Sequence, residues 1–464
     1  MAKLHILLAP VSALALAACA VGPDHVAPST PTTSSGPFLS TTPAVTTETV
    51  QADWWRLYQD PVLDQLIDDA LAHNTDIRVA VANIAKARAL LRESKSDRLP
   101  QVGASAGTNY GRLPASQRAP GAKREDWYTD IGLDVSYEVD LFGRVSRGVE
   151  ASQADLGAAQ ADADAVRVIV VAETARAYAD AASAAERIDV AKRIVDLLGQ
   201  SQGLTEKREN AGLATKLDVA RIAALRSQRL ADIPAIEAQR DAALFRLATL
   251  TGRAPRDLPV SASARTTMLT IEHPIPVGDG AALLARRPDV RAAERRLAGS
   301  TARIGVATAD LYPRVTLGGS VGSTGTGFDN IFGANPLTWL LGPLINWTVN
   351  QDAARARIAA AKADSQAALA TFDGTVLNAL EETETALSAY GHALEQRQAL
   401  QQARDEAERA AKITRAQQRE GAIDALASLD AERTLADAEA QLALANAAIA
   451  DRQIDLFRAL GGKW

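Results

Sequence analysis

The sequence repeats itself once, because three short segments of its first half recur in the same order in its second half. The matched pairs are residues 76–78 with 289–291, 99–102 with 312–315, and 251–253 with 461–463. The copies lie roughly 210 residues apart, far beyond the spacing of about 20–50 residues that marks a solenoid. We therefore expect a duplicated domain, in which each copy joins short alternating strands to very long Ala-rich helices.

The composition restricts the classes of partner. Of the 464 residues, 47% are hydrophobic and only 4% are aromatic, and alanine supplies much of the apolar share. Alanine is the best helix former and lets helices approach closely. The formal net charge is −6, so electrostatics give no support for a nucleic-acid partner.

The N-terminal residues indicate export. Residues 1–18 read as a signal peptide, with Lys3 before an apolar run that is too short to span a bilayer as a mature helix. The only cysteine, Cys19, closes a Leu-Ala-Ala-Cys segment that resembles the lipobox of bacterial lipoproteins. This resemblance implies an acylated Cys19 and, with Ala20 after it, sorting to the outer membrane. An ordinary signal peptide with a chance cysteine is the alternative.

The clearest strand signal covers residues 130–141, where apolar and polar residues alternate strictly. The apolar face consists of Ile131, Leu133, Val135, Tyr137, Val139 and Leu141. A period of two over about a dozen residues suits a membrane barrel strand with lipid outside and water inside. A soluble sandwich strand shows the same alternation but averages about half this length. Weaker versions of the pattern occupy residues 102–110, 315–321 and 339–349.

These strands are too few to close a barrel from one chain. Closed transmembrane barrels generally need at least about eight strands, and open sheet edges cannot lie in hydrocarbon. Several copies must therefore share one barrel, and three copies would supply about twelve strands. Trp339 and Trp347 are well placed for an interfacial aromatic belt.

Two very long helices are expected at residues 144–209 and 351–420, which contain no proline. At 1.5 Å per residue each would extend about 100 Å. Partner helices at 216–250 and 426–460 follow Gly-containing bends at 210–214 and 420–423, and a weaker helical pair recurs at 62–97 and 280–310. Each copy is thus expected to form a long antiparallel helix hairpin that grows from a strand pair.

Heptad spacing predicts which faces of these helices pack. One seam comprises Leu380, Thr383, Leu387, Tyr390 and Leu394. A second, built largely from small residues, comprises Leu217, Ala220, Ala224, Ser227 and Ala231. Pro234 is expected to interrupt and kink the first partner helix.

With these elements in place, the chain resembles the TolC-like outer-membrane factors, in their lipoprotein (OprM-like, NodT-type) branch. The resemblance is carried by residues 19–24, Trp54-Trp55, 60–63, 284–294, 424–433 and 458–462. The most specific segment is 284–294, Leu-Ala-Arg-Arg-Pro-Asp-Val-Arg-Ala-Ala-Glu, and the similarity runs from Cys19 to the C-terminus. One departure is residues 350–354, where relatives often carry glycines; it concerns the bend between strand and helix.

The resemblance implies an α+β membrane protein that forms a homotrimer. A twelve-stranded outer-membrane β-barrel, with four strands per protomer, would be continuous with a twelve-helix periplasmic α-barrel of coiled-coil hairpins, and the weaker helical pairs would form an equatorial belt. The expected division is a signal peptide at 1–18, a lipidated tether at 19–53, a first structural repeat at 54–253, a linker at 254–278 and a second repeat at 279–464.

The function implied by the resemblance is passive export. The duct would receive drugs or other small toxic compounds from a periplasmic adaptor and an inner-membrane pump of the resistance–nodulation–division (RND) type, which supplies the energy. A type I protein-secretion outlet is an alternative within the class. A periplasmic coiled-coil adaptor, or a structural envelope lipoprotein without conductance, are alternatives outside it.

The family places a gate at the free ends of the helix hairpins, with an acidic constriction in the second copy. The matching residues are Asp424, Leu426, Asp430 and Arg433, and their first-copy equivalents are Asp218 and Arg221. Rings of like carboxylates raise the local cation concentration and repel one another unless Arg partners or cations intervene. The alternative is that Asp430 with Arg433, and Asp218 with Arg221, are solvated helix-surface pairs.

No enzyme, metal site or cofactor other than the lipid on Cys19 is expected. Residues 318–322 match the Gly-x-Ser-x-Gly pattern, but a Gly-rich loop follows where a nucleophile elbow needs a helix. Residues 322–327 lack the Lys and helix start of a phosphate-binding loop. The five histidines are scattered without metal-ligand spacing.

Overall fold

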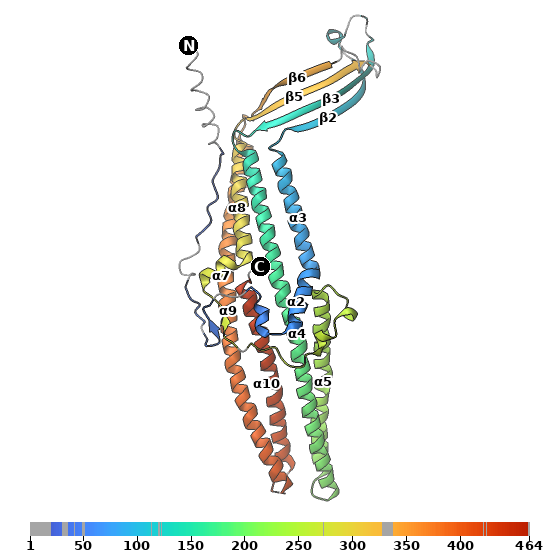
Figure 1. Cartoon of the computed structure of the whole chain (residues 1–464), viewed down its shortest axis with the longest axis vertical. Coiled ribbons are helices and arrows are strands. Elements are labelled where there is room, and N and C mark those ends of the chain that lie inside the picture. Colours follow the sequence, from blue (N-terminus) through green and yellow to red (C-terminus); the bar gives the residue numbers. More distant parts are fainter. Residues whose placement is uncertain are drawn as a thin grey trace. The chain divides into compact units, whose positions relative to one another are not determined.

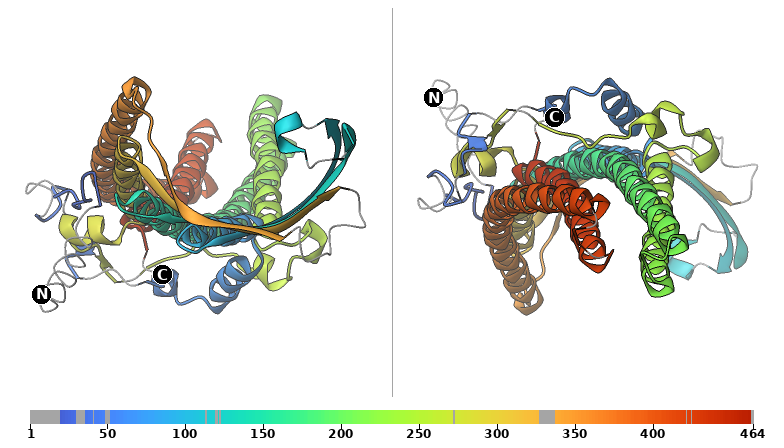
Figure 2. Two further views of the ribbon diagram at one scale, coloured as in Figure 1. Left: turned by 90° about the horizontal axis from the view of Figure 1, so that it is seen from above. Right: turned by 90° about the horizontal axis from the view of Figure 1, so that it is seen from below.

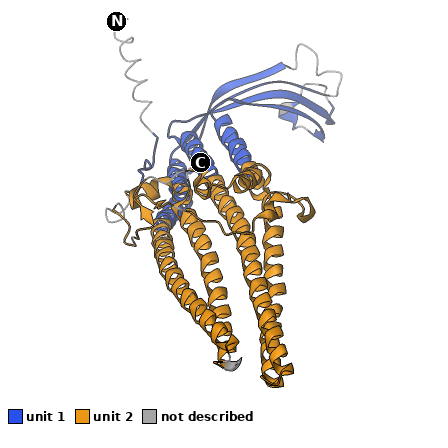
Figure 3. Cartoon of the chain, turned by 60° about the horizontal axis from the view of Figure 1, so that its bottom comes forward, with its two compact units in different colours: residues 1–28, 83–160, 292–373 blue, residues 29–82, 161–291, 374–464 orange. Residues whose placement is uncertain are grey.

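The structure is a computed structural model of the whole chain, and it describes residues 20–29, 36–40, 42–48, 52–112, 114–118, 121, 123–271, 273–326, 337–420, 422–423 and 425–462. The chain divides into two compact units, coloured separately in Figure 3. Unit 1 comprises residues 1–28, 83–160 and 292–373, and unit 2 comprises residues 29–82, 161–291 and 374–464. Each unit thus combines parts of both sequence copies.

The same order of elements occurs twice along the chain (Figure 1). The first set is α2 (Pro61–His73), α3 (Thr75–Ser96), β2 (Gln101–Arg112), β3 (Glu125–Val139), α4 (Arg144–Asn210) and α5 (Lys216–Leu250). The second set is α7 (Gly280–Arg286), α8 (Pro288–Ala309), β5 (Arg314–Thr326), β6 (Leu337–Asn346), α9 (Asp352–Arg419) and α10 (Ala425–Leu460). Between the sets lie α6 (Ser261–Ala264) and β4 (Ile275–Pro276), which pairs in parallel with β1 (Val45–Thr46). The duplicated helix-pair, strand-pair and hairpin order matches the sequence prediction.

Unit 1 contains a four-stranded antiparallel sheet in the order β2-β3-β5-β6, visibly curved in Figure 2. All four predicted strands are present. The predicted end of the last strand at Val349 is wrong, because β6 ends at Asn346. The next residue, Trp347, instead turns its indole Nε1 to the carbonyl oxygen of Leu311, which it bonds at 3.1 Å.

The register of the sheet places an apolar face across all four strands, although β6 also carries Leu340 and Leu344 on the opposite face. Leu133 of β3 lies between Ala104 of β2 and Val321 of β5, and Val321 pairs in turn with Trp339 of β6. Leu133 is 51% exposed and Trp339 is 75% exposed in the single chain. Exposed apolar side chains over a whole sheet face are unusual for a protein in water and suit contact with lipid.

Across β2, β3 and β5 the opposite face of the sheet is mainly polar and partly built from glycine. A Cβ atom on Gly103 would collide with the Asp134 carboxylate, and one on Gly107 would stand 3.1 Å from a carboxylate oxygen of Asp130. The glycines of β2 therefore make room for the acidic side chains of β3. This is the alternation that the sequence predicted for residues 130–141.

Unit 2 contains the helix hairpins and the main hydrophobic core. α4 runs beside α5 and α9 beside α10, and the two pairs meet where Ile194, Leu198, Leu225 and Ala436 pack together (Figures 1 and 2). Within the described residues, no helix is both long enough and apolar enough to cross a bilayer.

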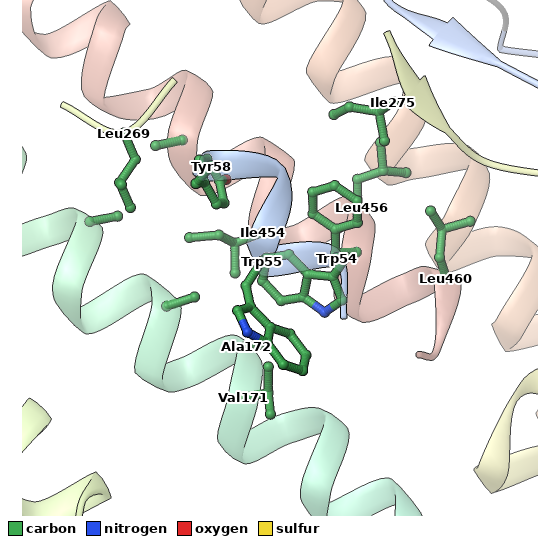
Figure 4. Close-up of a cluster of buried hydrophobic side chains, with 14 of the residues drawn as sticks. Trp54, Trp55, Tyr58, Val171, Ala172, Leu269, Ile275, Ile454, Leu456 and Leu460 are labelled. Atoms are coloured by element: carbon green, nitrogen blue, oxygen red, sulfur yellow. The ribbon is translucent and has the colours of Figure 1, made fainter. Parts of the chain in front are cut away.

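Trp54 and Trp55, two of the residues that carry the family resemblance, lie in the centre of this core (Figure 4). They belong to a 3-10 helix, Trp54–Tyr58, and Trp54 stacks on Phe457 of α10 with ring centroids 4.5 Å apart. Tyr58 donates a hydrogen bond to the side chain of Gln453, which itself donates to Tyr390 of α9. The residues before α2 therefore join both long hairpins at their inner ends.

The heptad prediction is confirmed within the chain for α9 and stays a prediction for α5. Thr383, Leu387 and Tyr390 of α9 are at most 4% exposed, as the seam requires. In the single chain the small-residue seam of α5 is exposed, and the residues of α5 buried within the chain are Ile222, Leu225, Ile233, Ala243, Leu247 and Ala248.

Pro234 lies inside α5 without interrupting it, because the helix is continuous from Lys216 to Leu250. The predicted interruption is therefore wrong.

Equivalent contacts hold the two copies in the same way. In the first, the side-chain amide of Asn74, between α2 and α3, donates to the last carbonyl of α5 at Leu250 over 2.9 Å. In the second, Arg286 at the end of α7 donates to the last carbonyl of α10 at Leu460 over 2.7 Å. Arg287 reaches the Ala459 carbonyl in addition. The Arg-Arg pair of the most family-specific segment thus caps the C-terminal end of α10.

Candidate gate at the hairpin ends

The two hairpin ends of unit 2 carry the predicted gate residues. α4 ends at Asn210 and turns through Gly212, whose φ of 80° favours glycine, into α5. Four of the predicted residues are described there: Asp218, Arg221, Asp430 and Arg433. Three predictions cannot be placed, because Asp424, Cys19 and the side chain of Leu426 lie outside the described residues.

Asp218 caps a helix. The Thr215 backbone N–H and hydroxyl both donate to its carboxylate, at 2.9 and 2.7 Å, while the Asp218 N–H donates back to the Thr215 hydroxyl at 3.3 Å. This reciprocal pair is a capping box at the start of α5. The hydrogen bonds hold the pKa of Asp218 below its ordinary value, and the charge of Arg221 acts in the same direction.

We expect a stability effect when this cap is removed. Thr215→Ala should destabilise the first hairpin end by about 1 kcal/mol, because the cap satisfies backbone donors that helix formation leaves unpaired. Since folding lowers the pKa of Asp218, the cap contributes at neutral pH and its contribution is lost on acidification through the lowered pKa, below the ordinary value of 3.8. Limited proteolysis between residues 205 and 220 measures the effect. Equal cleavage of Thr215→Ala and wild type at pH 7 would contradict it.

Asp430 and Arg433 do not form the expected pair. Asp430 is exposed, and its backbone carbonyl accepts the Thr434 hydroxyl at 2.9 Å. Arg433 instead lies 3.9 Å from Asp437, one turn further along α10. The carboxylate of Asp430 thus stands on the helix surface near the second hairpin end.

The strongest ion pair at the second hairpin end was missed by the sequence analysis. Arg415 of α9 makes a two-pronged contact with Glu432 of α10, and Glu432 is only 4% exposed. The hydrogen bond that Arg415 donates to Glu432 is the main reason that the pKa of Arg415 is raised. A charged residue on the buried face of a helix was the available signal, because such a residue is rarely buried without a partner.

Two further contacts join the first hairpin to the second. Arg208 of α4 donates to the Gln418 carbonyl of α9 at 2.6 Å, and Arg229 of α5 pairs with Asp437 of α10. A small polar pocket between them is lined by Ser201, Thr205, Asp218, Arg221, Gln418, Ser428 and Glu432, together with Ile222 and Leu429. The structure therefore brings Asp218 and Arg221 to the same pocket as Glu432.

Among the described residues, no three His, Cys, Asp or Glu side chains gather in a way that could hold a metal ion. The Arg208 and Arg229 contacts link one hairpin to the other. They can hold two hairpins together or release them.

Sequence comparison agrees with this duplicated architecture. The family model described as outer membrane efflux protein matches residues 66–253 and again residues 281–462. The chain belongs to the outer membrane efflux protein family, and it is the outer-membrane channel of an efflux system.

Full-length relatives give the same result. Outer membrane protein OprJ of Pseudomonas aeruginosa is 30% identical, over 97% of this chain and 94% of its own length. Nodulation protein T of Rhizobium leguminosarum bv. trifolii is 29% identical, over 94% and 92%. Among solved structures, the outer-membrane channel OprN is 38% identical with a TM-score of 0.90, covering 96% of this chain and all of that one. These likenesses confirm the family, the fold and the outer-membrane location predicted from the sequence.

Proposed function

We propose that three copies of this chain form one closed outer-membrane duct. The observation that carries the proposal is the sheet of unit 1. In the described residues β2 and β6 each pair on one side only, while the apolar face across all four strands is exposed. Unpaired backbone groups cost several kcal/mol each in hydrocarbon. Neighbouring copies can satisfy them by pairing β6 of one chain with β2 of the next.

The partners proposed for this duct are a periplasmic adaptor and an inner-membrane pump of the RND type. The duct holds no energy source of its own in this proposal, and transport through it is passive. The family is one of efflux channels, so no catalytic residue is needed.

The proposed cargo is small organic compounds. Relatives that match along nearly the whole chain include a toluene efflux pump outer membrane protein and an antibiotic efflux pump outer membrane protein, both of Pseudomonas putida. Another is a pyoverdine export outer membrane protein. These names favour small molecules over the protein cargo of type I secretion. Accumulation of a dye and an antibiotic in a deletion strain tests the choice.

We further propose that Cys19 carries the lipid anchor. Its lipobox and the outer-membrane location of the family support the modification. Mass spectrometry of the mature N-terminal peptide tests it, because acylation adds the mass of the lipid and a simple cleaved signal does not.

The hairpin ends are proposed to act as the gate. Arg208 and Arg229 hold the first hairpin to the second, and hydrogen bonds that involve a charged group are worth about 1.5–3 kcal/mol each. Loss of both would move a closed-to-open equilibrium by roughly a hundredfold or more. The Arg415–Glu432 pair stays within one hairpin and should preserve its shape.

The gate proposal predicts a leaky double variant. Arg208→Ala with Arg229→Ala should raise single-channel conductance in planar bilayers several-fold and sensitise cells to large antibiotics, because the two hairpins separate more readily. The matched control is Arg409→Ala, which removes an exposed arginine of α9 that pairs with Glu406 of the same helix and does not link the hairpins. Conductance equal to the wild type in the double variant, with normal assembly, would contradict a gate at this position.

A further inference from the structure

The segment that directly follows Cys19 is bound to unit 1 along its length. We call residues 20–25 the anchor strap. The backbone N–H of Val21 donates to the Phe142 carbonyl at 3.2 Å, in the turn between β3 and α4. At the other end His25 contacts the Glu294 carboxylate of α8 at 2.8 Å, with both side chains about five-sixths buried.

Arg147 of α4 is the centre of the binding site for the strap. Its side chain is only 7% exposed. The guanidinium donates to the Asp24 carboxylate at 2.6 Å, to the Val21 carbonyl at 3.4 Å and to the Gly22 carbonyl at 3.5 Å. Glu150, one turn further along α4, accepts a hydrogen bond from the remaining guanidinium nitrogen of Arg147 at 2.8 Å. A buried arginine that donates most of its hydrogen bonds to a segment without regular secondary structure fixes the path of that segment.

Three glycines allow the strap to lie so close. A Cβ on Gly22, which has a φ of 95°, would stand 2.5 Å from the Gly305 Cα of α8. A Cβ on Gly305 would stand 2.8 Å from Cγ of Arg147 and 2.9 Å from the Val21 carbonyl oxygen. A Cβ on Gly143 would stand 2.8 Å from Ala20. Strap and groove are thus complementary at the level of the backbone.

We infer that this groove is a binding site for the chain's own N-terminal segment, and that the bound strap sets the depth of the membrane anchor. The inference rests on the proposed acylation of Cys19. The strap begins one residue after Cys19 and is tied to the turn at which β3 ends. Phe142 of that turn stacks on Tyr312 at 4.5 Å, an aromatic pair of the kind found at membrane interfaces.

A comparison of lengths shows what the strap contributes. The next backbone contacts along the described chain are those of Gly36, whose carbonyl accepts the Gly280 N–H at 3.2 Å, and of Leu39 and Ser40, whose amides donate to Glu384, all within unit 2. Without the strap, about 20 residues would separate the anchor from these bonds, and a flexible segment of that length spans roughly 25 Å. That range approaches the roughly 30 Å thickness of the hydrocarbon core. Docking of the strap removes this freedom, so that the acyl chain enters the bilayer at a fixed depth relative to the sheet.

The test uses the full-length protein, purified in detergent, with two strap variants. Arg147→Ala removes the central donor, and Gly22→Val blocks the approach to Gly305 without altering α4 or α8. The matched control is Arg303→Ala, which removes a half-exposed arginine of α8 that pairs with Asp155 and does not touch the strap. Hydrogen–deuterium exchange of the peptide covering residues 20–29 reports docking. Exchange of its protected amides should accelerate at least tenfold in both strap variants and stay unchanged in the control.

Depth is measured separately, with a nitroxide on Val26→Cys after reconstitution into vesicles. Val26 is 82% exposed, so the label does not disturb the docked strap. We expect one narrow depth in the wild type and a broad distribution in both variants. Unchanged exchange, or a narrow depth after the strap is released, would overturn the inference.

An intact-mass measurement distinguishes a failure of the proposed lipidation of Cys19 from a failure of the proposed docking of the strap. An unacylated Cys19 with a protected strap would refute the proposed lipidation, and the depth-setting role with it. An acylated Cys19 with unprotected strap amides would refute the strap alone.

Discussion

Asp60→Ala should destabilise unit 2 by about 3 kcal/mol, because one carboxylate there serves two purposes. Asp60 is 5% exposed. One of its oxygens caps α2 by accepting the backbone N–H groups of Val62 and Leu63, at 2.8 and 3.2 Å. The other accepts Arg265 at 2.6 Å and the Tyr178 hydroxyl at 3.1 Å. Alanine removes the cap, worth about 1 kcal/mol. It also leaves the buried Tyr178 hydroxyl and the partly buried Arg265 without their acceptor, at a cost of about 2 kcal/mol.

The loss can be measured as a lower apparent melting temperature of the detergent-solubilised protein, followed by circular dichroism at one fixed heating rate. Asp60→Asn is the informative comparison. It keeps an oxygen for the cap but removes the charge facing Arg265, so its effect should be intermediate. A melting temperature unchanged in Asp60→Ala would show that the contacts of this carboxylate are replaceable by water.

The second large effect is expected at a single glycine. Gly252→Val should destabilise unit 2 by about 3 kcal/mol or more, because valine meets two obstacles there. Gly252 follows α5 with a φ of 69°, which costs a branched residue about 1–3 kcal/mol. A Cβ there would also stand 2.6 Å from the carbonyl oxygen of His73, the last residue of α2. Backbone cannot move aside as a flexible side chain can, so the overlap should add about 1–3 kcal/mol.

Gly212→Val separates these two causes. Gly212 has a similar φ of 80°, yet no atom lies within 4 Å of the position its Cβ would take. This control should therefore lose only the part due to backbone strain. If Gly252→Val and Gly212→Val melted at the same temperature, close packing against α2 would not be the reason for a glycine at position 252.

The elements of the fold could be predicted from local signals alone. The first partner helix was expected at residues 216–250 and is found there, because Thr215 caps its start and a glycine follows its end. Strict alternation likewise located β3, although the strand begins five residues earlier than predicted, at Glu125. Charged and aromatic residues at that end hide the period, while pairing with β2 extends the strand.

Contacts between distant residues could not be predicted in the same way. The face of α5 that is buried within the chain does not follow from the sequence, because heptad spacing fits more than one face of an Ala-rich helix and only the neighbouring helices decide between them. The sequence predicts Asp218 as a gate residue, and its bonds to Thr215 in the structure give it a helix-capping role. Arg208 and Gln418 stand about two hundred positions apart, and nothing in either local sequence indicates that they meet.

The unsatisfied outer strands of the sheet have a consequence for biogenesis. A single subunit leaves the outer edges of β2 and β6 unpaired. Such edges are unfavourable in the hydrocarbon core of the membrane and promote aggregation in water. Membrane insertion and association of the subunits must therefore occur together, and newly exported subunits need a chaperone until enough of them are present. A subunit that folds but has one outer strand unable to pair would join the barrel and prevent its closure. A variant of this kind is therefore expected to be dominant over the wild-type allele.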